Sequence, residues 1–323
     1  MRRKLIDRWK TEAGQALSDE VTARLIVGRT LNDLALDEYE GRVDLRFLPA
    51  PTPRRLKRFE AQGWFVEELG DLVTFRQARL ENLDLSGAQL HSFRFHASQI
   101  SGCRFDGTNC QDWRLWATDV INTSFVKASL RNAVVGAWYE GRGNRWSGIN
   151  FSGADFRVVP PEQATFEDCD FSEAKMAKVR FEQCTLIRCR FAGELREVVF
   201  DGRELPDRPA SPSMESVDFS DARFQQVEFM GFDLNGLILP NDPDLRVVRR
   251  ARCVARRGIE LLDGDDRVQA RMLRAMLETR LRGAGTESEA RVFNRRDYLE
   301  LGGVDLLRLA EDVTTRAETD CLK

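Results

Sequence analysis

The sequence predicts a mainly β solenoid with helical segments at both ends. Three observations predict this fold class. From Phe75 to Leu239, with three breaks, every fifth residue is large and apolar, and the residue two positions earlier is usually small or apolar. Outside this tract the apolar residues follow helical spacing instead. A period of five fits neither an α-helix nor an ordinary strand, so the chain must turn a corner every five residues and stack each turn on the last.

Composition and charge narrow the range of functions. The 323-residue chain is 31% charged and 42% hydrophobic, as expected of a globular protein. Its net charge is −3 at pH 7, whereas a nucleic-acid-binding protein should carry a clear basic excess, so we expect no direct nucleic-acid binding. No run of about 18 apolar residues occurs, so we expect no membrane span. Seven cysteines at irregular spacing imply no small disulfide framework, and a reducing, cytoplasmic location is expected.

The repeat falls into three phased runs, and we call the large residue of each unit its centre. A glycine-rich break near 136–145 separates the first run from the second, which passes over Pro161. A second break near 194–213 contains three prolines, which indicate an excursion from the repeat. The centres are Phe75, Leu80, Leu85, Leu90, Phe95, Ile100, Phe105, Cys110, Leu115, Val120, Phe125, Leu130 and Val135; Trp146, Phe151, Phe156, Phe166, Phe171, Met176, Phe181, Leu186 and Phe191; and Phe219, Phe224, Phe229, Leu234 and Leu239.

Several units resemble the A(D/N)Lxx pattern of the pentapeptide-repeat family, namely LDLSG at 83–87, ADFRV at 154–158, CDFSE at 169–173, VDFSD at 217–221 and FDLNG at 232–236. This resemblance implies a right-handed quadrilateral β-helix with four units in each coil. Residues twenty positions apart should then stack, at a rise of about 4.8 Å per coil. The expected core ladders are Phe75, Phe95 and Leu115; Leu85, Phe105 and Phe125; and Phe151, Phe171 and Phe191.

Five cysteines follow the same scheme. Cys110 is a centre, and the other four take the small inward position, where Cys169 and Cys189 should stack because they are twenty residues apart. A metal or redox site is one interpretation. We favour small buried hydrophobes, because no histidine or carboxylate points inward with the thiols, and we expect neither a metal nor a cofactor. The four in the small position are Cys103, Cys169, Cys184 and Cys189.

The two ends should cover the open edges of the solenoid, which would otherwise pair with other chains. We expect a helical N-terminal cap over 1–70, with a basic helix at 54–61, a repeat domain over 71–240, and a helical C-terminal domain over 241–323. The C-terminal region is larger than is needed to cover the exposed edge of one coil. This surplus predicts that its helices form a homodimer or dock a protein partner.

Two surface features are candidate partner contacts. Trp138 and Tyr139, in the first break, are expected to be the aromatic residues most open to solvent. The alternative is that they pack locally over the point where the five-residue repeat shifts by one position. An arginine-rich helix near 246–257 either binds an anionic partner or is a solvated face paired with nearby acids, and we favour the solvated face. The arginines concerned are Arg249, Arg250, Arg256 and Arg257.

The sequence contains no recognisable catalytic apparatus. Its two histidines, His91 and His96, each follow a centre and should point outward, and no nucleotide-binding, metalloprotease or nucleophile motif occurs. We therefore predict a non-enzymatic protein-binding scaffold that presents a rigid rod to a macromolecular partner. An enzyme with a site between the rod and the C-terminal helices is the least favoured alternative.

The family resemblance implies a more specific alternative. Some bacterial pentapeptide-repeat proteins protect type II topoisomerases such as gyrase from antibiotics, dimerise through their C-termini and imitate DNA. This chain departs from that pattern in its large C-terminal region and in its charge, because residues 75–240 contain 19 basic and 23 acidic residues. DNA imitation requires a denser negative field.

Overall fold

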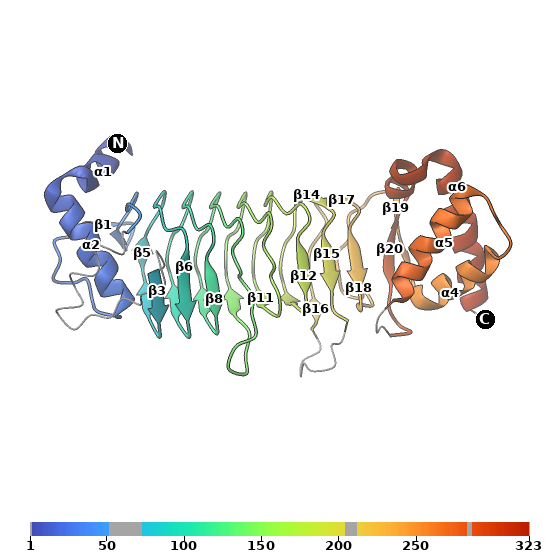
Figure 1. Cartoon of the computed structure of the whole chain (residues 1–323), viewed down its shortest axis with the longest axis horizontal. Helices are drawn as coiled ribbons and strands as arrows, with labels where there is room; N and C mark the ends of the chain where they lie inside the picture. Colours follow the sequence, from blue (N-terminus) through green and yellow to red (C-terminus); the bar gives the residue numbers. More distant parts are fainter. Residues whose placement is uncertain (1, 52–72, 204–211, 283–285, 323) are drawn as a thin grey trace.

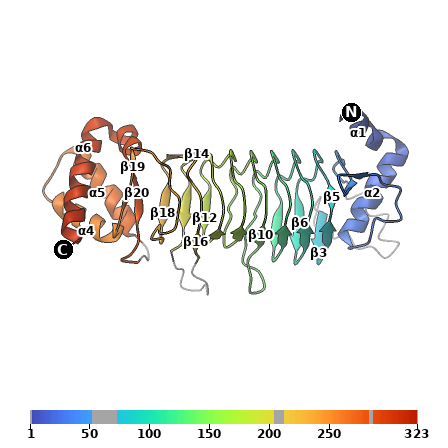
Figure 2. The same ribbon diagram turned by 180° about the vertical axis from the view of Figure 1, so that it is seen from behind.

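The computed structural model describes residues 2–51, 73–203, 212–282 and 286–322. Stacked coils form an elongated rod, with α1 and α2 at one end and α4, α5 and α6 at the other (Figures 1 and 2). The predicted β-helical solenoid is confirmed. In the described part of the chain, no helix has the length and apolar character that crossing a bilayer requires.

Short strands and a few helices make up the elements. At the N-terminal end lie α1 (Arg2–Asp7), η1 (Arg8–Lys10), α2 (Glu12–Ile26), β1 (Glu38–Tyr39) and β2 (Arg42–Asp44). The rod contains β3 (Val73–Arg76), β4 (Arg79–Glu81), β5 (Leu83–Asp84), β6 (Phe93–His96), β7 (Gln99–Ser101), β8 (Arg114–Trp116), β9 (Asp119–Ile121), β10 (Arg145–Ser147), β11 (Thr165–Glu167), β12 (Arg180–Glu182), β13 (Thr185–Ile187), β14 (Gly193–Arg196), β15 (Val199–Asp201), β16 (Met214–Glu215), β17 (Ala222–Gln225) and β18 (Glu228–Met230). The C-terminal end contains β19 (Leu245–Val248), α4 (Ala251–Leu261), α5 (Val268–Leu281), β20 (Arg291–Asn294) and α6 (Arg295–Cys321).

The register of the rod advances by twenty residues per coil. Phe75 pairs with Phe95, and Phe95 pairs with Leu115, in parallel strands β3, β6 and β8. Their side chains stack inside the rod, as the Phe75 and Phe95 rings do with centroids 4.7 Å apart. A second ladder joins Phe151 and Phe171 at 5.0 Å. All the residues named for the three ladders, together with Cys169 and Cys189, are buried.

Most corners of the coil are formed by a residue in the left-handed region, two positions after a centre. Glycine occupies some corners, but most carry side chains, and each such residue costs about 1–2 kcal/mol. Hydrogen bonds between coils offset this cost, as when the Gln77 amide donates to the His96 carbonyl at 2.9 Å. In the first run the corners are Gln77, Asn82, Gly87, Ser92, Ala97, Gly102, Gly107, Asp112, Ala117, Asn122, Lys127 and Asn132.

The first break is a real insertion. Val120 pairs with Trp146, 26 positions later, so six residues leave the coil between them. The buried Asn144 closes the gap: its Oδ1 accepts from the Thr118 amide at 2.9 Å, and its Nδ2 donates to the carbonyls of Leu115 at 2.9 Å and Val135 at 3.0 Å. The coil therefore continues across the slip, with the Asn144 side chain in place of the missing backbone partners.

The second break is shorter than the predicted 194–213. Strands β14 and β15 continue the coil as far as Asp201, with Leu195 and Phe200 buried. Phe200 pairs with Phe181, 19 positions earlier, so one residue is missing from this coil and the period shifts by one. The five-residue pattern stops at Phe191 because of this one-residue shift. The expected excursion is not the reason, since the coil continues beyond Phe191. Of the expected excursion, 204–211 lies outside the described residues.

At the N-terminal end the ladder begins before the expected boundary near 71. Strand β2 pairs in parallel with β5, matching Val43 to Leu83, so 42–44 form an additional rung on the first coil. The side chain of Thr11 caps α2 by accepting from the amide of Gly14 at 3.0 Å. The predicted basic helix at 54–61 lies outside the described residues.

The C-terminal region packs on the last coil and has its own hydrophobic core. The Ala290 amide donates to the Phe232 carbonyl at 2.9 Å, and Asn294 Nδ2 donates to the Phe224 carbonyl at 3.0 Å. The predicted arginine-rich helix near 246–257 is wrong in its first half. Residues Leu245–Val248 form β19, which pairs antiparallel with β20, and α4 begins only at Ala251. The two valines of β19 favour this strand because β-branched side chains pack well in sheets.

Candidate functional site

A surface groove of about 360 Å³ lies beside the first break, and we call it the loop groove. Its floor belongs to the widest sheet of the rod, ordered β16-β13-β11-β10-β9-β7-β4. The first break supplies one wall, and Pro212, at the end of the second break, also lines the groove. The lining residues are Asp119, Trp138, Arg142, Gly143, Asn144, Arg145, Gln163, Ala164, Thr165, Gln183, Thr185 and Pro212.

Trp138 lies at this groove with 43% of its surface exposed. Its neighbour Tyr139 is only half-buried and pairs with Arg142 across the tip of the insertion, which is the green loop below the rod in Figure 1. The Tyr139 ring meets His96 edge-on at 5.9 Å, and His96 in turn stacks on Trp116 at 4.4 Å. Tyr139 therefore anchors the insertion to the rod, while Trp138 presents an open aromatic surface.

Ion pairs hold the polar walls of the loop groove. Arg142 contacts Asp119 at 2.7 Å, and Arg145 contacts Glu167 at 2.6 Å. Arg188 adds a second contact to Glu167 at 2.8 Å. Hydrogen bonds from Arg145 and Arg188 lower the pKa of Glu167, which therefore stays ionised at neutral pH. Arg188 also contacts Asp168 at 2.7 Å, so three arginines face three acids and their charges balance. Exposed pairs of this kind contribute more to shape and specificity than to stability.

The repeat is matched by a known family. Residues 74–112 and 162–193 match the family model for pentapeptide repeats, in 8 copies. The rod of this chain therefore contains pentapeptide repeats. No curated protein sequence matches it at a significant level.

Several solved pentapeptide-repeat structures are similar to the rod. A trypsin-treated variant of QnrB1, a plasmid-mediated fluoroquinolone resistance protein, is 21% identical, with 52% of this chain and 80% of that chain covered and a TM-score of 0.27. HetL from the cyanobacterium Nostoc sp. strain PCC 7120 is 16% identical, with 58% and 90% covered and a TM-score of 0.20. Rfr23 from the cyanobacterium Cyanothece 51142 is 14% identical, with 45% and 97% covered and a TM-score of 0.17. At these identities, the functions that their names state belong to those proteins.

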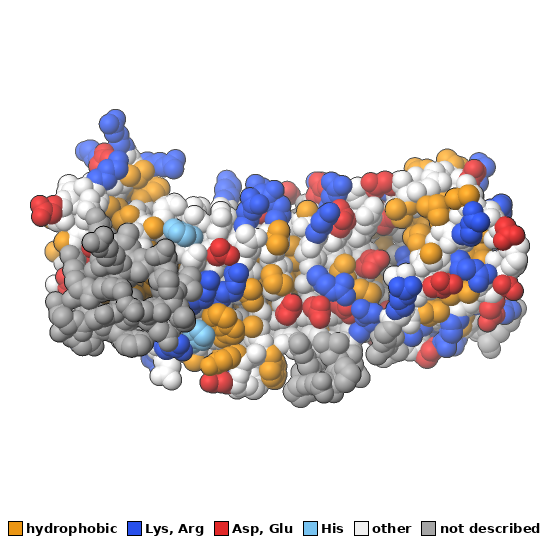
Figure 3. All heavy atoms as spheres, viewed as in Figure 1, with side chains coloured by type: hydrophobic (Ala, Val, Ile, Leu, Met, Phe, Trp, Pro, Cys, Tyr) orange, Lys and Arg blue, Asp and Glu red, His pale blue; other side chains and the backbone are white. Residues whose placement is uncertain are grey.

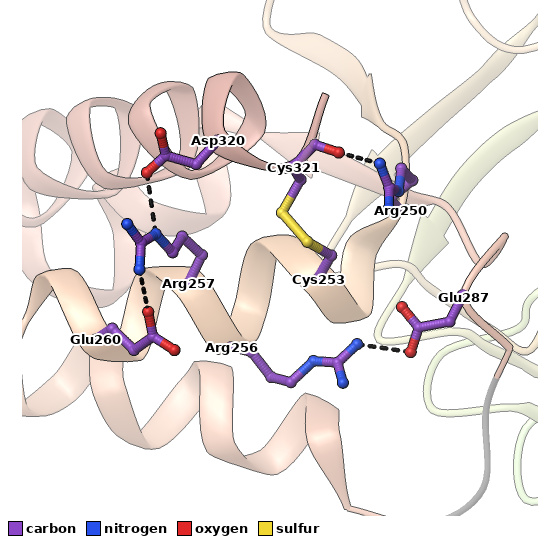
Figure 4. The surroundings of a disulfide bond; sticks show 8 residues. All are labelled: Arg250, Cys253, Arg256, Arg257, Glu260, Glu287, Asp320 and Cys321. Atoms are coloured by element: carbon purple, nitrogen blue, oxygen red, sulfur yellow. Dashed lines mark hydrogen bonds and ion pairs between the residues drawn. A yellow bond between two sulfur atoms is a disulfide. The ribbon is translucent and has the colours of Figure 1, made fainter. Parts of the chain in front are cut away.

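The four arginines proposed as partner contacts lie in α4 or directly before it, in the C-terminal region, whereas Trp138 belongs to the first break of the rod. Figure 1 shows α4 at the C-terminal end of the rod. Each has a local partner, and Figure 4 shows three of them. Arg256 pairs with Glu287 at 2.6 Å and Arg257 with Asp320 at 2.9 Å. Arg250 donates to the Cys321 carbonyl, and Arg249 donates to the Asn235 side chain at 3.3 Å. These pairings favour a solvated face over an anion-binding one.

A disulfide bond joins Cys253 in α4 to Cys321 at the end of α6 (Figure 4). The sequence did not indicate this bond, because the two cysteines are 68 positions apart and no spacing pattern relates them. The expectation that the cysteines form no disulfide framework therefore misses one covalent link between the ends of the C-terminal domain.

The five remaining cysteines are buried free thiols inside the rod. Burial raises the pKa of Cys103 and of Cys184 to about 12, so both thiols stay protonated at neutral pH. Among the described residues, no three histidine, cysteine or acidic side chains are placed to hold a metal ion. The five thiols pack within the hydrophobic core of the rod.

Proposed function

We propose that this protein is a non-enzymatic scaffold that binds a protein partner through the loop groove. The exposed Trp138 beside a rigid, charge-balanced floor is the observation that carries the proposal. Tryptophan and arginine are the residue types that most often dominate the binding energy of protein interfaces, and Arg142 and Arg145 flank Trp138 here. A stacked core lets the rod present this surface at little cost in conformational entropy.

Site-specific photo-crosslinking in the native host tests this proposal. A photoreactive residue at position 165, on the floor of the loop groove, should capture one defined protein, and Trp138→Ala should weaken that complex about tenfold or more. The same residue at position 158 is the control, because Val158 is 66% exposed but does not line the groove. Equal capture at both positions, or a complex that Trp138→Ala leaves intact, would contradict the proposal.

The handedness of the coil, the role of the terminal helices and the cellular location of the protein are part of the same proposal. We infer a right-handed coil, which the family resemblance implies and which parallel crossovers strongly prefer. We also infer that the helices at the two ends act as caps, because they pack on coils whose edges would otherwise pair with other chains. A cytoplasmic location is proposed as well, with the Cys253–Cys321 bond reduced or formed according to local redox conditions.

A homodimer through the C-terminal helices is a further part of the proposal. Leu299 and Val304 on α6 are 46% and 51% exposed, respectively, and such residues can pack against a second copy. Sedimentation of the purified chain should show a dimer that Leu299→Glu with Val304→Glu disrupts. A monomer at micromolar concentration would exclude this interface.

The topoisomerase alternative depends on a continuous negative surface. On the visible face of the rod, acidic and basic side chains alternate instead (Figure 3). Several acids are paired, as Asp201 is with Arg203 at 2.8 Å and Asp221 is with Arg190 at 2.5 Å. We therefore expect no inhibition of gyrase supercoiling at micromolar protein and no relief of a gyrase poison. Inhibition of gyrase at micromolar protein would favour the topoisomerase alternative over a general protein-binding scaffold.

A further inference from the structure

A cavity of about 190 Å³ lies where the rod meets the C-terminal domain. Its walls come from β18, α4, α5, β20 and α6, so it forms only when the last coil and the C-terminal helices pack together. The volume corresponds to about six water molecules. The lining includes apolar residues, among them Val227, Phe229 and Met276, and charged residues, among them Arg252, Glu289 and Arg291.

Arg291 is the unusual residue of this cavity. Its side chain lines the wall, the residue is 7% exposed, and none of its three guanidinium nitrogens has a hydrogen-bond partner among the described residues. An arginine cannot escape this situation by losing its proton, because its pKa is too high. A buried charge without a partner is strongly unfavourable, so the site calls for an anionic group.

Two further polar atoms of the same cavity lack partners. They are Nη1 of Arg252, which is a donor, and Oε2 of Glu289, which is an acceptor when the carboxyl is ionised. Burial raises the pKa of Glu289, and a cation beside it would reverse this effect. The cavity therefore contains unmatched donors on two arginines and an unmatched acceptor on one glutamate.

Of the other charged groups that line the cavity, Asp297 and Arg280 have partners and Glu228 is exposed to solvent. Asp297 accepts from the Gln226 amide at 2.9 Å and from Asn294 Nδ2 at 3.1 Å. Arg280 donates to the Tyr298 hydroxyl at 3.3 Å. The buried polar atoms of the cavity that lack partners among the described residues are therefore those of Arg252, Glu289 and Arg291.

We propose that this cavity binds a small zwitterion of the chemical class of an apolar α-amino acid. Its carboxylate would pair with Arg291 and Arg252, its ammonium group with Glu289, and its side chain would pack on Phe229 and Met276. Guanidinium groups match carboxylates in a planar, two-point geometry, which gives specificity as well as affinity. A simple inorganic anion would satisfy the arginines but would face the Glu289 carboxylate, so it fits less well.

This inference is independent of the proposed partner groove. The ligand would touch the rod and the C-terminal domain at once, so it would stabilise their junction through mass action.

Binding is tested on the full-length chain by thermal unfolding and titration calorimetry. The probes are L-valine, L-leucine and L-phenylalanine, the matching 2-hydroxy acids, the matching amines without a carboxylate, and inorganic phosphate. At least one amino acid should raise the unfolding temperature and bind more tightly than its hydroxy acid, whereas amines and phosphate should have no effect. Equal binding of the hydroxy acid, phosphate binding alone, or no binding by any probe would overturn the proposal.

Two variants separate binding from folding. Arg291→Met removes the unpaired charge, so the ligand-free protein should unfold at the same or a higher temperature while ligand affinity falls about 10- to 100-fold. Glu289→Gln should abolish the preference for the amino acid over the hydroxy acid. Arg256→Gln is the matched control, since this exposed arginine pairs with Glu287 outside the cavity. A lower unfolding temperature for ligand-free Arg291→Met would show that the protein itself satisfies this guanidinium and would overturn the proposal.

Discussion

Asp44 is the residue through which the N-terminal helices attach to the rod. Its carboxylate accepts from Arg8 of η1 at 2.8 Å and from Arg46 at 2.8 Å, and its side chain is 5% exposed. Burial alone would raise the pKa of Asp44, but the hydrogen bonds from Arg46 and Arg8 hold the pKa well below its usual range. Trp9 completes the attachment by donating to the Arg46 carbonyl at 2.8 Å.

Replacing Asp44 by asparagine should lower the free energy of unfolding by about 2–4 kcal/mol at pH 7, because two buried arginine contacts lose their charge partner. The stabilisation is present above about pH 4, where an unfolded aspartate is ionised, and is lost as the pH falls toward the lowered pKa of the folded state. Urea denaturation at pH 7 and pH 3 should therefore show a gap between wild type and variant that narrows in acid. The exposed Asp312→Asn is the control and should change little at either pH. A gap that widens in acid would contradict this assignment.

The buried thiols should be chemically silent in the folded protein. Burial raises the pKa of Cys103 and Cys184 to about 12, so these two thiols stay protonated at pH 8. All five free thiols are buried, so a disulfide reagent should reach none of them before the rod unfolds. With the Cys253–Cys321 bond formed, a colorimetric thiol assay should detect no reactive thiol in the native chain and five in denaturant. Fast reaction of any thiol before unfolding would show that the rod interior is open.

At the scale of the elements, the insertions decide how the rod differs from a plain stack of coils. The six-residue insertion before β10 leaves the ladder intact, because a single buried side chain replaces the missing backbone partners. The missing residue before β15 likewise shifts the frame while Phe200 still stacks on Phe181 at 5.0 Å. Coils therefore tolerate changes in length at their corners as long as the inward side chains keep their places.

Asn144→Ala should lower the free energy of unfolding by about 2–4 kcal/mol, because it leaves the Thr118 amide and the Leu115 carbonyl buried without partners. The Val135 carbonyl keeps one donor, Trp146 Nε1 at 2.8 Å. Hydrogen exchange should rise at the strands beside the first insertion, β9 and β10. The exposed Asn150 serves as a control on the same coil, and Asn150→Ala should cost less than about 1 kcal/mol. Equal effects of the two substitutions would mean that Asn144 does not close the frame slip.

At the scale of the whole molecule, the chain combines a rod with a separately packed C-terminal domain. Backbone and side-chain hydrogen bonds join them, as when Arg203 Nη1 donates to the Arg282 carbonyl at 2.9 Å. The C-terminal domain is closed by the bond between Cys253 and Cys321, which ties the start of α4 to the end of α6.

Replacing both Cys253 and Cys321 by serine should destabilise the C-terminal domain by about 4 kcal/mol, the chain-entropy value for a loop of this length. The rod contains neither cysteine, so its own transition should stay in place. Differential scanning calorimetry of the oxidised protein, the reduced protein and the double variant checks this, with the last two expected to agree. A double variant as stable as the oxidised protein would show that the bond does not form in solution.

The sequence by itself determined the β-helical rod, its twenty-residue register, the inward ladders such as Phe151, Phe171 and Phe191, and the outward histidines. These features follow from a short local period, because each inward residue repeats the role of the one twenty positions earlier. Trp138 could also be recognised as exposed, since it falls in a glycine-rich break where the period fails.

Only the tertiary structure decided the features that join distant parts of the chain. Strand β19 forms because β20 lies beside it, more than forty residues later. The Cys253–Cys321 bond, the loop groove and the cavity around Arg291 likewise depend on side chains far apart in sequence. A local pattern predicts how one segment repeats along the chain. A cavity or a disulfide bond depends instead on how distant segments pack together, and the spacing of residues in the sequence does not determine that packing.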